Sequence, residues 1–263
     1  MADLNIGSMV VEVNGVGSPV LMVHGLGGNS NSFHTLMDAL EKFRVIRPDL
    51  PGAGRSSFRP GLSSLVKMAD LMKSVLTALG EKNCHLVGHS MGTLICQLIS
   101  VRFPSMVKSL TLFGPMLEPP IEARSALKER AEKIRKGGIA EVADIISSNS
   151  ISPKSKSDNP VVSAFVRESI LNQNPQGYAT HCEALSKSKA VEHDLIQCPT
   201  LLVVGDADQV TSMEMARSLS TKIFNSRIEI LKDVGHWPLI ENSVKSKELL
   251  LEHINFIEGM KGE

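Results

Sequence analysis

Short apolar runs alternate with segments in which apolar residues recur three and four positions apart. The apolar runs predict strands at residues 20–23, 43–47, 84–87, 107–113, 200–204 and 227–231. The helical spacing predicts helices at residues 33–40, 65–79, 91–103, 213–219 and 242–257. Strands and helices in alternation are typical of an α/β domain, in which a mostly parallel central sheet carries helices on both faces.

The first segment of the chain has a different period. Residues 8–14 alternate through Met9, Val11 and Val13, and the alternation stops at Asn14 and Gly15. Asn-Gly is a strong signal for a tight turn between antiparallel strands. We therefore expect the first hairpin to turn at Asn14 and Gly15.

The pattern changes again between residues 116 and 190, where charged and small polar residues dominate. Residues 122–137 have the spacing of an exposed helix, whereas residues 147–160 are polar and contain two prolines, which predicts a loop. We interpret residues 116–190 as a helical cap inserted into a core that residues 1–115 and 191–263 form. We expect this cap to affect substrate preference more than the chemistry.

Composition restricts the class of partner. With 263 residues, of which 42% are hydrophobic, the chain can bury the core of one large domain. Lys and Arg together number 28, as do Asp and Glu, so no net charge favours nucleic acid or an anionic membrane. A small-molecule partner is expected instead. The sequence contains no signal for an oligomeric state.

Targeting and metal-binding signals are also missing from the sequence. The first residues show no basic segment followed by an apolar one, and no run of 18 apolar residues occurs, so we expect a cytoplasmic protein. The four cysteines, at positions 84, 96, 182 and 198, form no C-x-x-C pair. We therefore predict free thiols and no metal site.

The strongest chemical signal is the G-x-S-x-G pattern of Gly88–Gly92, which lies between a predicted strand and a predicted helix. A serine on such a sharp strand-to-helix turn has its hydroxyl pushed out of the sheet, and the glycines leave room for the tight fold. Ser90 is therefore the candidate nucleophile.

Two later strand ends supply an acid and a histidine. Asp206 and Asp208 follow the strand at 200–204, and His236 follows the strand at 227–231. The residue pattern alone accepts either carboxylate. Asp206 lies at the first step of the turn, where a carboxylate usually bonds local backbone N–H groups, so we favour Asp208 as the partner of His236. Ser90, Asp208 and His236 then occur in the chain order of the α/β-hydrolase triad.

Along almost its whole length the chain resembles the α/β-hydrolases. The matching motifs are His24–Gly25 in the oxyanion loop, Asp49–Ser56 with the pattern D-x-x-G-x-G-x-S, Gly88–Gly92 at the elbow, Gly205–Asp208 at the acid turn and Gly235–His236 in the histidine loop. Within this family it is similar to the 3-oxoadipate enol-lactonase branch, including residues 174–179 of the cap and 198–201 before the acid strand. It departs from the family in Ala53, where an aromatic residue or histidine is common, and in Thr211–Ser212, where Thr-Pro is usual.

The resemblance implies a Ser-His-Asp hydrolase that needs no cofactor and acts through an acyl-enzyme intermediate. It also implies that the backbone N–H groups of Leu26 and Met91 form the oxyanion hole. A serine at the elbow argues against the dehalogenase and epoxide hydrolase branches, which use an aspartate nucleophile.

Residues beside these motifs receive other interpretations. Trp237, the only tryptophan, follows His236 and is either a substrate-binding wall or a buried scaffold contact. We interpret His89 as a packing residue inside the elbow. We interpret Glu241 as a cap of the final helix and Asp49 as an acceptor for backbone N–H groups of its loop.

Three functions stay open at this point. The first is hydrolysis of a small carboxylic ester or lactone, and the second is hydrolysis of a carbon–carbon bond with the same triad. The third is ligand sensing, because the plant karrikin and strigolactone receptors resemble this fold and keep a similar triad. Sustained turnover of short esters would favour an enzyme, whereas a single slow turnover with destabilisation of the cap would favour a sensor.

Overall fold

The computed structural model describes residues 2–259, and within this range eight strands form a single sheet in the order β1-β2-β4-β3-β5-β6-β7-β8. Strands β3 to β8 pair in parallel, and β2 pairs antiparallel with β1 and β4. The predicted mostly parallel sheet is thereby confirmed. The strands are β1 (Ala2–Ile6), β2 (Met9–Asn14), β3 (Pro19–Val23), β4 (Arg44–Pro48), β5 (Cys84–His89), β6 (Val107–Phe113), β7 (Thr200–Gly205) and β8 (Ser226–Leu231).

The first hairpin turns at Gly7 and not at Asn14 and Gly15, so that prediction was wrong. Ile6 pairs with Met9 across a turn in which Gly7 has a φ of 62°. Gly15 does adopt a positive φ, but a Cβ atom there would lie 2.3 Å from the carbonyl oxygen of Phe43. The Asn-Gly turn therefore packs against the segment before β4, and the chain continues to β3 inside the sheet.

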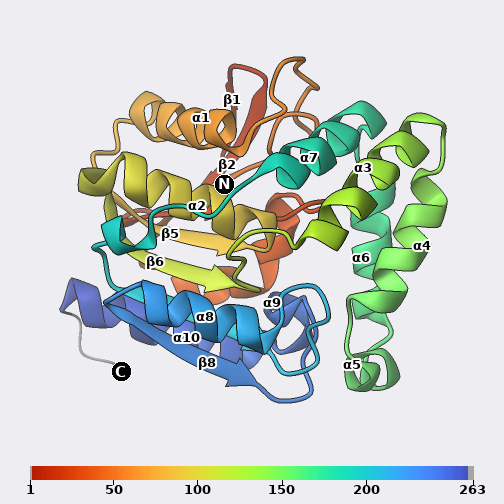
Figure 1. Ribbon diagram of the computed structural model, residues 1–263. Helices are drawn as coiled ribbons and strands as arrows, with labels where there is room; N and C mark the ends of the chain where they lie inside the picture. The colour runs from red at the N-terminus through yellow and green to blue at the C-terminus, as the bar shows by residue number, and fades with distance from the viewer. Residues whose placement is uncertain (1, 260–263) are drawn as a thin grey trace.

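Helices cover both faces of this sheet (Figure 1). The side chains of η1 and α10 form one buried cluster with Val20 and Met22 of β3, and those of α1, α2 and α8 join a second cluster with Leu21 and Val23. Alternate residues of one strand thus reach opposite faces, as the pleat requires. The helices are η1 (Ser30–Leu40), α1 (Leu65–Ala78), α2 (Met91–Arg102), η2 (Pro104–Met106), η3 (His193–Leu195), α8 (Met213–Lys222), α9 (Pro238–Glu241) and α10 (Ser243–Glu258). Among the described residues, no helix combines the length and the apolar character that crossing a membrane requires.

The predicted helical cap is confirmed as an insertion between β6 and β7, and it stands beside one end of the sheet in Figure 1. Its limits at residues 116 and 190 stay a prediction. The cap helices are α3 (Ile121–Arg135), α4 (Ile139–Asn149), α5 (Pro153–Asp158), α6 (Val161–Leu171) and α7 (Pro175–Lys187).

The loop that we expected at residues 147–160 is partly helical. Helix α4 continues to Asn149, and α5 occupies 153–158. The two prolines that suggested a loop stand at helix starts: Pro153 begins α5, and Pro160 immediately precedes α6. Proline is tolerated there because the first N–H groups of a helix have no partner within the helix.

Candidate active site

Ser90 lies between the last residue of β5 and the first residue of α2, with φ 52° and ψ −120°. Such a conformation is rare for a residue other than glycine and typically costs about 1–3 kcal/mol. Its backbone N–H donates to Phe113 O at 3.0 Å, and the N–H of Thr93 donates to Ser90 O at 2.8 Å. A Cβ atom at Gly92 would lie only 2.0 Å from Val23 O, so the turn requires glycine there.

The structure brings the three predicted triad residues together. His236 Nε2 lies 2.8 Å from Ser90 Oγ, and His236 Nδ1 lies 2.8 Å from Asp208 Oδ2. All three residues are buried, with exposed fractions of 7% for Ser90, 5% for His236 and 4% for Asp208. The hydroxyl, the imidazole and the carboxylate thus form a continuous hydrogen-bonded chain that is shielded from water.

Asp208 and Asp206 have different surroundings. The carboxylate of Asp208 accepts hydrogen bonds from the N–H groups of Val210 and Thr211 at 2.7 and 2.8 Å, and from the Thr211 hydroxyl at 2.7 Å. Burial opposes its charge, but His236 and the two donors of Thr211 hold the pKa of Asp208 below its ordinary value. Asp206 is exposed and accepts from the backbone N–H of Asp233 at 2.7 Å, so it joins its turn to the one after β8. Contrary to our expectation, it does not bond the described N–H groups of its own turn.

The predicted oxyanion loop passes beside Ser90, since a Cβ atom at Gly25 would lie 2.8 Å from Ser90 Cβ. Met91 is the first residue of α2, so its N–H has no partner within the helix. Among the hydrogen bonds of residues 2–259, none uses the N–H of Leu26 or of Met91. Two uncommitted donors beside a buried serine are what an oxyanion hole requires.

The cap also holds this oxyanion loop. The hydroxyl of Ser169 on α6 donates to Gly27 O at 2.7 Å. The side-chain amide of Gln173, just after α6, donates to Gly27 O at 3.2 Å and to Gly28 O at 3.1 Å. The cap therefore positions the backbone that passes beside Ser90.

Glu241 does not cap the final helix, which corrects our interpretation. Asn242 performs that task by accepting from Lys245 N at 3.2 Å. The Glu241 carboxylate instead accepts from the backbone N–H groups of Gly235 and Trp237 in the histidine loop and of Ser152 in the cap, each at 2.9 Å. The result is a tie between the loop of His236 and the cap.

Replacing Glu241 with glutamine is expected to lower both stability and turnover. The glutamine amide offers one acceptor oxygen, and its NH₂ group cannot accept from the remaining N–H groups. A displaced histidine loop should lower kcat by about 10- to 100-fold, since small misplacements of catalytic groups have effects of this size. Steady-state kinetics and a thermal melt check this result.

The matched control is Asn242→Ala, which removes the α10 cap at a cost of about 1 kcal/mol in stability and should leave turnover unchanged. Wild-type turnover in the Glu241→Gln variant would contradict a positioning role for Glu241.

The rings of His89 and Trp237 pack against His236. The ring centroid of His89 lies 4.7 Å from that of Trp237, and His89 Nε2 lies 2.8 Å from the backbone oxygen of His236. Burial lowers the pKa of His89 to about 3, so this imidazole is neutral and its Nε2–H donates to His236 O. His89 therefore packs in the elbow, as we interpreted it, and also holds the histidine backbone.

Trp237 is 2% exposed, and its indole N–H donates to Ser150 Oγ at 2.9 Å. The same residue lines the cavity in front of Ser90. Trp237 is thus a buried scaffold contact that also forms part of the cavity wall, and its contact with substrate stays a prediction.

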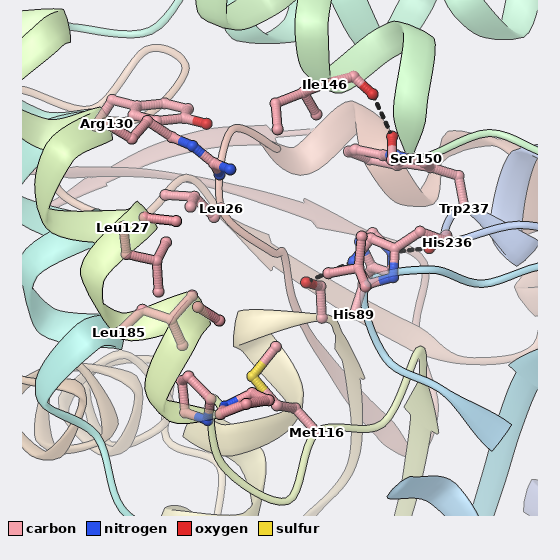
Figure 2. Close-up of a pocket in the computed structure, with 17 residues that line it drawn as sticks. Leu26, His89, Met116, Leu127, Arg130, Ile146, Ser150, Leu185, His236 and Trp237 are labelled. Atoms are coloured by element: carbon pink, nitrogen blue, oxygen red, sulfur yellow. Dashed lines mark hydrogen bonds between the residues drawn. The ribbon is translucent and has the colours of Figure 1, made fainter. Parts of the chain in front are cut away.

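A cavity of about 160 Å³ lies between the cap and the hydrogen-bonded residues Ser90 and His236 (Figure 2). Drug-sized ligands usually occupy pockets of roughly 300–1,000 Å³, so this cavity favours a small substrate. No cluster of His, Cys, Asp and Glu side chains within residues 2–259 is suited to hold a metal ion. The lining is mostly apolar. It consists of Leu26, His89, Ser90, Met116, Pro119, Pro120, Ala123, Ala126, Leu127, Arg130, Ile146, Ser150, Tyr178, Leu185, Val210, His236 and Trp237.

Comparison with known proteins gives concordant matches. Residues 18–243 match the model of the alpha/beta hydrolase fold family. The chain is 26% identical over 226 residues to (E)-2-((N-methylformamido)methylene)succinate hydrolase of Acinetobacter baylyi, with 84% of each protein covered. It is 24% identical to 3-oxoadipate enol-lactonase 1 of the same organism, over 95% of this chain and 94% of that protein.

A solved esterase of Thermogutta terrifontis superposes with a TM-score of 0.90 at 27% identity, over 95% of this chain and 93% of the other. These matches confirm the predicted resemblance, including its similarity to the enol-lactonase branch. Because the family model covers most of the sequence, the chain belongs to the α/β-hydrolase family.

Proposed function

We propose that the chain is a serine hydrolase that cleaves a carboxylic ester or lactone of a small molecule. The observation that carries this proposal is the buried chain from Ser90 Oγ through His236 to Asp208, which opens on a small and mostly apolar cavity. The relatives named a lactonase and an esterase support the choice of an ester bond.

In the first step, Ser90 Oγ attacks the carbonyl carbon while His236 Nε2 takes its proton. The ionised Asp208 holds His236 Nδ1–H and stabilises the imidazolium that forms. The developing oxyanion accepts from the N–H groups of Leu26 and Met91. His236 then gives its proton to the departing alkoxide, and the acyl group stays on Ser90.

In the second step, a water molecule takes the place of the leaving alcohol. His236 removes a proton from this water, which attacks the acyl carbon, and the oxyanion forms again at the same two N–H groups. Collapse of the intermediate breaks the bond to Ser90 Oγ, and His236 returns the proton to the serine. The product is a carboxylic acid, and no cofactor takes part.

The test is a panel of short esters and lactones assayed on the purified protein. We expect sustained hydrolysis over many cycles, and with activated p-nitrophenyl esters an initial burst of up to one p-nitrophenol per protein if hydrolysis of the acyl-enzyme is slower than its formation. A single slow turnover accompanied by destabilisation of the cap would contradict an enzyme and favour a ligand sensor. Cleavage of carbon–carbon bonded substrates without ester hydrolysis would contradict the ester assignment.

A further inference from the structure

Arg130 is a charged residue in an otherwise mostly apolar cavity. It belongs to α3, on the stripe of residues that faces the cavity with Ala123, Ala126 and Leu127, spaced three and four positions apart. Figure 2 shows its side chain extending from α3 toward the interior of the cavity. No aspartate or glutamate is among the described residues that line this space.

Other arginines of the cap have carboxylate partners, since Arg124 pairs with Glu118 at 2.9 Å and Arg167 pairs with Asp144 at 2.6 Å. Of the ion pairs among residues 2–259, none includes Arg130. Arg130 is half-buried, and a partly desolvated guanidinium gains from a carboxylate because the pair forms two parallel hydrogen bonds.

Tyr178 of α7 lines the same cavity and lies beside Arg130. Burial raises the pKa of the Tyr178 hydroxyl, and Arg130 offsets only part of that rise, so the phenol stays protonated. Tyr178 therefore adds no negative charge, and Arg130 presents its donors in a cavity whose described lining contains no anionic side chain.

We propose that the substrate carries a carboxylate, which Arg130 binds while the ester or lactone carbonyl lies at Ser90. This inference rests on the proposed function and specifies its substrate class. The cavity volume restricts such a substrate to a short half-ester of a dicarboxylic acid or to a lactone with a short carboxylate arm.

The test compares two esters of nearly the same shape, monoethyl glutarate and its neutral amide counterpart, ethyl glutaramate. We expect wild-type kcat/KM to be about 10- to 100-fold higher for the carboxylate, the ratio that a charged hydrogen-bonded pair supplies. Arg130→Gln should remove this preference. It should lower kcat/KM for monoethyl glutarate only, mostly through a higher KM. Arg130→Lys should keep part of the preference and gives a second measurement if the glutamine variant does not fold.

The matched control is Lys128→Gln, which removes the same charge from an exposed position of the same helix. It should leave the preference unchanged. Equal hydrolysis of both esters by the wild type, or an unchanged preference in Arg130→Gln, would overturn the inference and leave the proposed function standing.

Calorimetric titration with glutarate distinguishes failure of the proposed anion site from failure of the proposed hydrolase function. If neither ester is hydrolysed yet glutarate binds the wild type and not Arg130→Gln, the anion site stands and the proposed function fails. If glutarate binds both proteins equally, Arg130 is not its site.

Discussion

Replacing Ser90 with alanine is expected to lower kcat on an activated ester by a factor on the order of 10⁶, the effect of losing the serine in a known triad hydrolase. The fold should persist, because among the described residues the substitution removes one hydrogen bond, that between Ser90 Oγ and His236 Nε2. A fluorophosphonate probe should label wild-type protein at Ser90, located by mass spectrometry, and should not label the variant.

Ser74→Ala is the matched control, because Ser74 is an exposed serine of α1 whose hydroxyl donates only to Asp70 O. This control should keep full labelling and full turnover. Labelling of the Ser90→Ala protein at another residue, or turnover close to that of the wild type, would contradict the assignment of the nucleophile.

Asp208→Asn is expected to lower kcat by about 10³- to 10⁴-fold, because an amide in this place favours the wrong tautomer of His236. The Asp208 carboxylate accepts His236 Nδ1–H at 2.8 Å, whereas the asparagine NH₂ group donates and cannot accept this proton. Turnover on one activated ester measures the effect, after a thermal melt has shown that the variant is folded.

Asp206→Asn is the natural comparison, since it makes the same chemical change two residues earlier. Asp206 accepts the backbone N–H of Asp233, which lies in the turn after β8, so we expect a loss of about 1 kcal/mol in stability and near-normal turnover. A severe loss in this variant, combined with high activity of Asp208→Asn, would reverse the assignment of the two carboxylates.

The fold could be predicted from the sequence to a large extent because its signals are local. Apolar periodicity placed β5 and α2 around Ser90. Ser90, Asp208 and His236 each follow a predicted strand, and their chain order is that of the α/β-hydrolase triad. Asp49 also accepts from a backbone N–H of its own loop as predicted, that of Arg55 at 3.0 Å, and in addition from Ser30 N of η1 at 2.7 Å. In each case a few neighbouring residues are enough to determine the local geometry.

The contacts that support the site could not be predicted, because they join distant parts of the chain. Gln173 bonds Gly27 across 146 positions of the sequence. This bond depends on how α6 packs against the oxyanion loop, and no local pattern in the sequence indicates that packing. Glu241 lies close to His236 in sequence, yet its position just before a helix suggested a cap instead. Residues typical of turns were misleading for the same reason. Asn14–Gly15 does not form the hairpin turn but packs against the segment before β4, and Pro153 does not lie in a loop but begins α5.

The hydrogen bonds that join the cap to the loop of Gly27 and to the segment around His236 affect how the proposed hydrolase can discriminate among substrates. Lifting α4 to α6 would break the bonds to Gly27 and Gly28 on one side. On the other side it would break the bond that Trp237 donates to Ser150 and the one that Ser152 donates to Glu241. An open protein would therefore be able to hold a molecule but not to process it. Compounds too large for the closed cap should act as slow substrates or competitive inhibitors, so selection by size should be measured in kcat more than in KM.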